Sequence, residues 1–250
     1  MRRQTIPIFP LLIMGVFLVF TSSCEKNGDN NPASSNQTNG KTTAVFNADL
    51  TYGTMTDQDG NVYKTVTIGT QTWMAENLRT TIYNDGTAIP NVTDDDEWVG
   101  LTTGAYCNYK NTTSVDTIAT YGRLYNWYAV NTGKLAPTGW HVPTDAEWTE
   151  LTDYIGGTFV SGGILKEAGT THWASPNTGS TNESGFTALP GGYRGYSGGF
   201  RSFGYGGRWW SATELGSNHA WRRYIDYYVI DVEGYYSDKW VGLSVRCVRD

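Results

Sequence analysis

The chain has 250 residues, of which 39% are hydrophobic and 17% charged, and its net charge is −6. This composition excludes collagen, a coiled coil and a polytopic membrane protein, and the length suits one large or two small domains. The 30 glycines beside 10 tryptophans indicate a compact, loop-rich β domain, since a disordered chain would lack large aromatic residues. The domain has no basic run longer than Arg222-Arg223, so nucleic acid is excluded as a partner because it demands clustered Lys and Arg.

The first residues have the pattern of an export signal. A basic start, Met1-Arg2-Arg3, precedes an apolar run from Ile6 to Phe20, which is too short for a comfortable transmembrane helix. Cys24 then follows three small residues, which resembles the lipobox of lipoproteins from Bacteroidota-like bacteria. We expect residues 1–23 to be a signal peptide and Cys24 to carry lipid, which would place the protein at the outer membrane or cell surface. The alternative is an ordinary signal peptide that is cut nearby.

The cysteine count leads to a second prediction. Three cysteines in an exported chain leave one without a partner. If Cys24 carries lipid, Cys107 and Cys247 remain as an even pair, and the exported compartment permits a disulfide. We therefore predict a Cys107–Cys247 bridge.

Residues 24–52 are polar, rich in Asn, Ser and Thr, and lack an apolar period, so we predict a flexible tether there and a domain over 53–250. Alternating residues over 62–68 and 71–74 around Gly69-Thr70 predict a hairpin. The preceding Asp57-Gln58-Asp59-Gly60-Asn61 resembles the start of a calcium loop, but Ile68 stands where an EF-hand has Glu. A turn is the favoured interpretation of Asp57 and Asp59, and a calcium site is the alternative.

Helical and β patterns follow in turn. A short helix is predicted over 121–133, and a second one over 144–155 begins with a Thr144/Glu147 capping box. A third helical turn is predicted over 163–167. The remainder is β, with strands predicted over 220–226, 228–232 and 241–248 and a turn at 233–234. Strands at both ends of the domain predict an α+β fold in which the ends meet in one sheet.

Six segments resemble, in this order, the Fibrobacter succinogenes major paralogous domain. Two of them are residues 139–148, which begin Gly-Trp-His-Val-Pro-Thr, and residues 244–250, which read Ser-Val-Arg-Cys-Val-Arg-Asp. The others are residues 59–63, 68–78, 185–194 and 209–214, so the resemblance covers nearly the whole domain. It implies a C-type-lectin-like fold, with an antiparallel sheet, two short helices and long irregular loops, on an exported bacterial lipoprotein. It implies no particular activity.

The sequence offers little for catalysis or metal binding. The Glu-Pro-Asn, Gln-Pro-Asp and Trp-Asn-Asp tripeptides of calcium-dependent C-type lectins are absent, as is the reactive cysteine pair of formylglycine-generating enzymes. The three histidines are isolated, no zinc-ligand spacing occurs, and no Gly-x-Ser-x-Gly elbow is present. The carboxylate run Asp94-Asp95-Asp96-Glu97 is interpreted as a solvated loop, with a loose cation site at Asp94 and Asp96 as the alternative. We expect no enzyme and no cofactor apart from a possible calcium ion; a hydrolase of polysaccharide is the alternative, because paired carboxylates are not visible in a sequence.

The segment 191–208 has the composition of an antibody-like paratope, Tyr, Gly, Ser and Arg almost throughout. We predict a deformable loop that binds ligand, and the alternative is a loop packed on itself. Tyr224, Tyr227, Tyr228, Tyr235 and Tyr236 either form a stacking platform for sugar rings or simply cover the sheet. We therefore expect a lipid-anchored recognition module for glycan or another envelope or extracellular macromolecule; the rival is a structural or adhesion component. The predicted ligand-binding residues are Tyr193, Arg194, Tyr196, Phe200, Arg201, Tyr205, Arg208 and Trp209.

Overall fold

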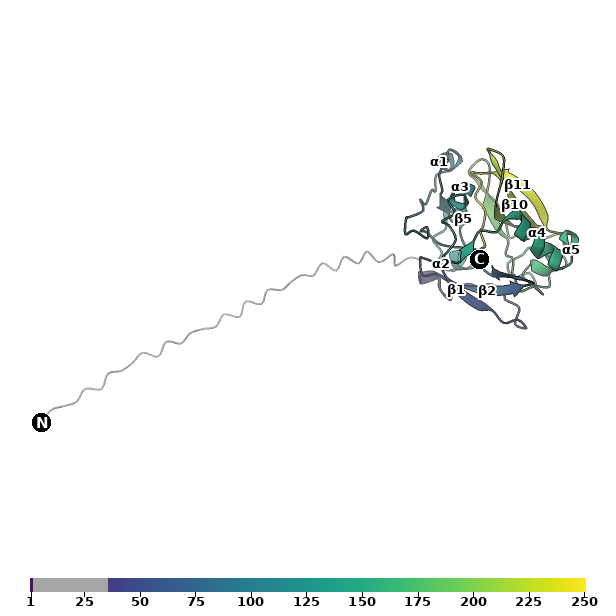
Figure 1. Ribbon diagram of the computed structural model, residues 1–250, viewed down its shortest axis with the longest axis horizontal. Coiled ribbons are helices and arrows are strands. Elements are labelled where there is room, and N and C mark those ends of the chain that lie inside the picture. The colour runs from purple at the N-terminus through teal and green to yellow at the C-terminus, as the bar shows by residue number, and fades with distance from the viewer. Residues whose placement is uncertain (2–35) are drawn as a thin grey trace. The chain divides into compact units, whose positions relative to one another are not determined.

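The computed structural model describes Met1 and residues 36–250 (Figure 1). The predicted signal peptide, the lipid site at Cys24 and the first part of the predicted tether lie outside these residues. Within the described part of the chain, no helix is long and apolar enough to cross a membrane.

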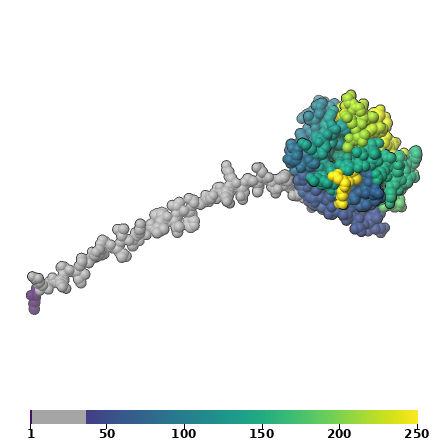
Figure 2. All heavy atoms as spheres, viewed as in Figure 1, coloured from purple at the N-terminus to yellow at the C-terminus, as the bar shows by residue number. Residues whose placement is uncertain are grey.

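The first sheet joins the two ends of the domain. Its order is β1 (Gly53–Thr56), β2 (Val62–Ile68), β3 (Gln71–Met74), β12 (Val248–Arg249) and β6 (Trp140–His141). The predicted hairpin is confirmed, since Ile68 pairs with Gln71 and Gly69 turns the chain with φ +63°. Val248 pairs with Trp73 on one side and His141 on the other, both antiparallel. In Figure 2 the yellow C-terminal atoms accordingly lie between teal and blue atoms of earlier segments.

The second sheet contains the segment that we predicted as a deformable loop. Its order is β11 (Glu233–Asp238), β10 (His219–Asp226), β9 (Gly206–Leu215), β7 (Gly191–Arg194) and β8 (Phe200–Phe203). Residues 191–208 are therefore a β-hairpin followed by the start of β9, and the prediction of a deformable loop is wrong. The glycines serve close packing here: a Cβ on Gly207 would lie 2.2 Å from the Trp209 ring, and Gly207 pairs with Gly192 of β7.

The strand β10 confirms the prediction over 220–226, whereas residues 228–232 form no strand. That segment instead runs against α5, where Gly163 N–H donates to the Ile230 carbonyl (3.1 Å) and Val232 N–H to the Thr158 carbonyl (2.9 Å). The neighbouring strand is β11, which includes the predicted turn at 233–234. Residues 241–248 make only isolated bridges before β12.

Short elements connect the two sheets. The capping box of α4 forms as predicted, because the Thr144 and Glu147 side chains each bond the other's backbone N–H. The helix predicted over 121–133 is interrupted: Gly122, with φ +72°, ends α2, and Asn126 caps the much shorter α3. The third predicted helical turn is right for residues 163–165, which end α5, and wrong for 166–167, because Lys166 is extended and bridges to Ala188. The bounds are α1 (Asp95–Val99), β4 (Tyr106–Cys107), α2 (Val115–Tyr121), β5 (Leu124–Tyr125), α3 (Trp127–Val130), α4 (Asp145–Tyr154) and α5 (Thr158–Leu165), with 3-10 turns η1 (Asn36–Thr38) and η2 (Tyr109–Asn111). The fold is therefore α+β, as predicted.

Alternation along β9 divides two tryptophans between two hydrophobic cores. Trp209 packs in the core that contains Trp73, Trp148 and Phe186, and Trp210 packs in the other large core. Both indole rings are fully buried. The prediction that Trp209 contacts ligand is therefore wrong, because its side chain points into the interior.

The predicted disulfide is also wrong. Cys107 and Cys247 are both buried free thiols, and they belong to different core clusters. Each cysteine packs as a small apolar side chain; burial raises the pKa of the Cys107 thiol to about 12 and raises that of Cys247 as well. The cysteine count carried no information on the distance between the two thiols.

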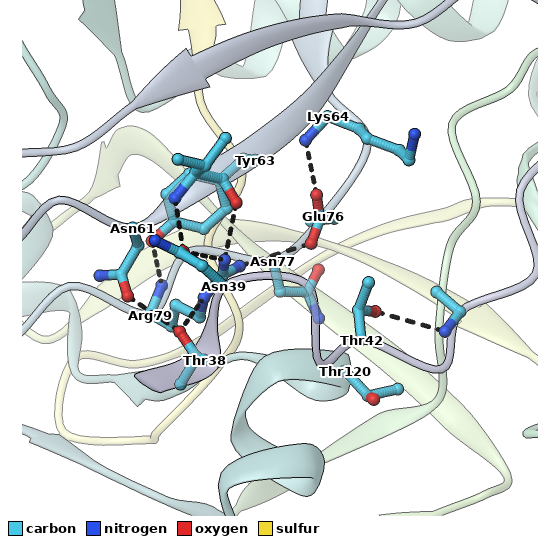
Figure 3. Close-up of polar contacts among 12 residues, drawn as sticks. Thr38, Asn39, Thr42, Asn61, Tyr63, Lys64, Glu76, Asn77, Arg79 and Thr120 are labelled. Carbon is cyan, nitrogen blue, oxygen red and sulfur yellow. Dashed lines mark hydrogen bonds and ion pairs between the residues drawn. The ribbon is translucent and has the colours of Figure 1, made fainter. Parts of the chain in front are cut away.

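Part of the predicted tether is packed on the domain (Figure 3). The Thr38 hydroxyl donates to Asn61 Oδ1 (3.0 Å) and accepts a hydrogen bond from Arg79 Nε (2.8 Å). Asn39 bonds both the Gly60 carbonyl (2.9 Å) and Val62 N–H (2.8 Å). The segment between Thr38 and β1 therefore belongs to the folded domain, and the boundary that we predicted at residue 53 is wrong.

Candidate functional site

One face of the second sheet gathers arginine and tyrosine side chains. Arg208 of β9 lies opposite Tyr224 of β10, and Arg222 of β10 lies opposite Tyr235 of β11. Cross-strand partners project from the same face of a sheet, and β10 and β11 lie side by side in Figure 1. We call this surface the arginine–tyrosine face; its members are Tyr193, Tyr196, Arg208, Arg222, Tyr224, Tyr235 and Tyr236.

The guanidinium of Arg208 is held between two aromatic rings. Its Cζ lies 4.0 Å from the centre of the Tyr193 ring and 4.2 Å from that of Tyr224. Cations are attracted to the faces of such rings, so the two tyrosines hold the arginine side chain in a fixed orientation. Tyr193 comes from β7, and three adjacent strands thus build this part of the face.

The neighbouring cation, Arg222, is held by a hydrogen bond and by weaker ring contacts. Its Nε donates to the Ser237 hydroxyl at 2.9 Å, and its Cζ lies 5.5 Å from the Tyr235 ring centre. Tyr235 in turn stacks on Tyr236, with ring centres 4.6 Å apart and planes 12° from parallel. Tyr196, on the turn between β7 and β8, is close enough to influence the pKa of both arginines.

The two arginines are poorly compensated cations. Burial lowers the pKa of Arg208, and burial together with the nearby Arg208 charge lowers that of Arg222 to about 10. Arg222 therefore remains protonated at neutral pH. The Nη1 atom of each is shielded from solvent and has no hydrogen-bond acceptor among the described residues.

Arg194, a predicted ligand-binding residue, is different. It is fully buried, and it bonds the carbonyls of Val92 (2.7 Å) and Gly198 (2.7 Å) and the Asp95 carboxylate (2.7 Å). Its donors are therefore used inside the protein to fix the start of α1 beside the β7–β8 hairpin. The prediction that Arg194 binds ligand is wrong for this reason.

The other predicted residues of the 191–208 segment lie in several places. Tyr193, Tyr196 and Arg208 come together in the arginine–tyrosine face. Phe200 packs edge-on against Tyr109, Arg201 is exposed on β8, and Tyr205 is exposed beside Tyr227. Sequence reasoning missed Arg222, whose alternation with Tyr224 on a strand was the available signal.

The aspartates considered for calcium have other partners. Asp57 Oδ1 accepts from the N–H groups of Asp59 and Asn61 (both 2.9 Å), and its Oδ2 accepts from the Tyr63 hydroxyl (2.5 Å). These hydrogen bonds are those of a turn, the interpretation that the sequence favoured. Asp59 Oδ2 accepts from the Thr81 hydroxyl at 2.8 Å.

The run 94–97 is a helix start and not a loop, since Asp94 caps α1 and Asp96 lies in its first turn. Over residues 36–250, no group of three or more His, Cys, Asp or Glu side chains comes together to hold a metal ion.

His141 is bonded between two carboxylates at the surface. Its ring nitrogens lie 2.6 Å from Asp250 and 2.7 Å from Glu147. Partial burial disfavours the charged ring, but these two hydrogen bonds outweigh it and raise the pKa of His141. The histidine therefore joins the end of β12 to the first turn of α4, which is a structural arrangement.

A groove of about 960 Å³ lies elsewhere, between the β2–β3 hairpin and the end of α4. Its lining includes Val66, Ile68, Tyr154 and Ile155, and its charged side chains are Glu183 and Arg249. No member of the arginine–tyrosine face lines this groove. Because a single acid and a single base there have no described contact with each other, the groove offers less for recognition than the face does.

The geometry defines an α+β domain with an exposed face of stacked tyrosines around two arginines. Residues 66–249 match the model of the Fibrobacter succinogenes major domain, and the chain belongs to that family. The match begins within β2 and ends in β12, so it spans both sheets and confirms the resemblance seen in the sequence. Searches of curated proteins and of solved structures found no match.

Proposed function

We propose that this protein is an extracytoplasmic recognition module that binds glycan through the arginine–tyrosine face. The observation that carries the proposal is the cluster of exposed rings there: Tyr196 is 57%, Tyr235 50% and Tyr236 38% exposed. Large aromatic side chains gathered at a surface mark interaction sites. Tyrosine also offers a large contact area at a low cost in conformational entropy.

The chemistry of the face suits a sugar. A pyranose ring has an apolar side, which stacks on an aromatic ring, and a rim of hydroxyl groups that exchange hydrogen bonds. The stacked Tyr235–Tyr236 pair offers such a ring surface, while the guanidinium groups beside it offer donors in a fixed fork. Ring stacking and fixed donors both serve binding, so we propose binding and not hydrolysis.

We extend the proposal to the fold, which we assign to the C-type-lectin-like class. The assignment is supported by the antiparallel first sheet, in which the domain's ends meet, by a second sheet that is antiparallel except for the β7–β9 pair, and by the small number of helices among the described residues. The ligand would then be bound without the calcium tripeptides of sugar-binding C-type lectins. An experimental structure that fails to superpose on that class would overturn this part.

Alanine replacement of Tyr196, Tyr235 and Tyr236 tests the binding face. We expect the full-length chain to bind one or more glycans on an array, and the triple variant to bind them at least tenfold more weakly because the stacking surface is gone. The matched control is Tyr154→Ala, which removes a tyrosine that is 67% exposed on α4 and should leave binding unchanged.

Unchanged binding by the triple variant would place the site elsewhere. A wild-type chain that binds no glycan would favour the structural or adhesion role, and release of reducing sugar would favour a hydrolase.

The location is a separate part of the proposal. The sequence around Cys24 supports a lipid anchor at the outer membrane or cell surface. Labelled palmitate should enter the wild-type protein in cells and fail to enter Cys24→Ala, because the thiol is the attachment point. Equal labelling of the two proteins would sink the assignment of Cys24. The control is Cys107→Ala, whose thiol is buried and should not affect labelling.

A further inference from the structure

The two guanidinium groups of the arginine–tyrosine face are arranged at a cost to the folded state. Arg208 and Arg222 project from adjacent strands, and both are partly buried. In both arginines the Nη1 atom is shielded from solvent and has no hydrogen-bond acceptor among the described residues. A buried donor with no partner is unfavourable, and such exceptions in a folded protein call for an explanation. Their position on a surface rich in exposed tyrosines points to a ligand.

The positive charge of these two arginines suits an anionic ligand. Three other buried arginines pair with a carboxylate: Arg79 with Glu76, Arg194 with Asp95, and Arg223 with Asp145. The buried Arg123 and Arg246 instead donate to carbonyl and amide oxygens within the protein. Among the described residues, no ion pair joins Arg208 or Arg222 to a carboxylate. The nearby Asp226 carboxylate instead accepts from the Tyr224 hydroxyl and from Tyr228 N–H (2.9 Å).

We propose that the ligand of the arginine–tyrosine face is an acidic glycan, whose carboxylate or sulfate group is bound by Arg208 and Arg222. The sugar ring that carries this group then lies against the exposed tyrosines. The inference rests on the proposed function and names its substrate class. A guanidinium presents a planar fork of donors that matches the oxygens of such a group, and the rings of Tyr193 and Tyr224 already hold Arg208 in place.

The net charge of the chain bears on how an acidic ligand would be attracted. With a net charge of −6, the protein's overall field repels a polyanion, so attraction must come from the local site. Binding by nonspecific charge alone is therefore not expected. Exposed tyrosine faces beside the arginines favour a ring-containing polymer over an acidic peptide, and the peptide becomes an outcome of the test.

The test compares acidic and neutral sugars on the full-length chain by titration calorimetry. Oligogalacturonate is paired with its carboxyl-reduced counterpart, and dextran sulfate with dextran, so that the two sources of oxyanion are separated. We expect at least one acidic polymer to bind tenfold or more tightly than its neutral counterpart. Arg208→Gln and Arg222→Gln should each reduce that preference at least tenfold, because a charge-assisted bond is lost. The control is Arg249→Gln, an exposed arginine of the other sheet.

The variant Arg222→Lys covers the case in which a glutamine variant fails to fold. It keeps the positive charge but lacks the fork, so we expect a weaker preference for the acidic polymer with an unchanged circular dichroism spectrum. Equal affinity for acidic and neutral polymers, unaffected by the arginine variants, would overturn this inference and leave the proposed function intact. Tighter binding of polyglutamate than of any acidic glycan would overturn it in favour of an acidic peptide. Absence of binding to every glycan would overturn the proposed function itself.

Discussion

Replacement of Arg246 by alanine is expected to lower the free energy of unfolding by about 3–5 kcal/mol, because it leaves several buried acceptors without a donor. Arg246 is fully buried. Its Nε donates to Asn77 Oδ1 (2.9 Å) and its Nη2 to the Thr187 carbonyl (2.8 Å), while Nη1 reaches the carbonyls of Met74 and Phe186. One side chain therefore joins β3, the segment before β7 and the segment before β12.

The electrostatic situation of Arg246 strengthens this expectation. Burial lowers its pKa to about 9, and the Glu76 carboxylate opposes that change. The guanidinium also lies 4.2 Å from the Phe186 ring centre. The cation is thus tolerated in the interior because its donors are occupied.

Urea unfolding followed by circular dichroism measures the change, and a shifted midpoint with an unchanged slope reports a change in stability alone. The matched control is Arg249→Ala three residues later. Arg249 is exposed and contacts the Trp140 ring at 5.2 Å, so its loss should cost less than about 1 kcal/mol. If both variants cost the same small amount, Arg246 does not hold the sheet and loops together.

Replacement of Trp148 should show a large effect that depends on the substitute. Its ring centre lies 4.8 Å from that of Trp73, 5.9 Å from Phe186 and 6.4 Å from Trp209. Trp148→Ala is expected to cost about 3–5 kcal/mol, since a cavity opens in the middle of this aromatic cluster. The measurement is again urea unfolding by circular dichroism, because tryptophan fluorescence changes with the substitution.

Trp148→Phe is expected to be much milder, at about 1.5 kcal/mol or less. The indole Nε1 is shielded and has no acceptor among the described residues, so phenylalanine removes an unsatisfied donor while it keeps most of the packing. Tyr154→Ala, on the exposed side of the same helix, serves as control for helix propensity. A phenylalanine variant as unstable as the alanine variant would contradict this account.

Local patterns in the sequence were sufficient for several elements. The capping box of Thr144 and Glu147 forms within one helical turn, and the hairpin around Gly69 needs only strands next to each other in the chain. Both elements are determined by residues that are close together in the chain, so the sequence alone is enough to predict them. Strand patterns at both ends of the domain also predicted that the ends meet in one sheet.

Other features depend on which distant residues meet, and a single sequence does not contain that information. The strand β11 lacks an apolar alternation, and it forms because it pairs with β10 in a fixed register. Residues 228–232 look more like a strand, yet Gly162 and Gly163 let them run against α5; a Cβ on Gly162 would lie 2.1 Å from the Asp231 carbonyl oxygen.

The same limit applied to the candidate site. The composition of the 191–208 segment drew attention to Tyr193, Tyr196 and Arg208, which the structure brings together. It also included Arg194 and Trp209, because composition does not distinguish the two faces of a strand. Arg222 was missed because its closeness to Arg208 follows only from the register between β9 and β10.

The position of β12 has a consequence for how the chain acquires its structure. This strand lies between β3 and β6. Both of those strands are synthesised long before β12, so neither can pair with it until the end of the chain has been made. Contacts between residues so far apart in the chain slow folding, because a large loop must close before they form. The first sheet therefore closes late, only after the C-terminal residues have been synthesised.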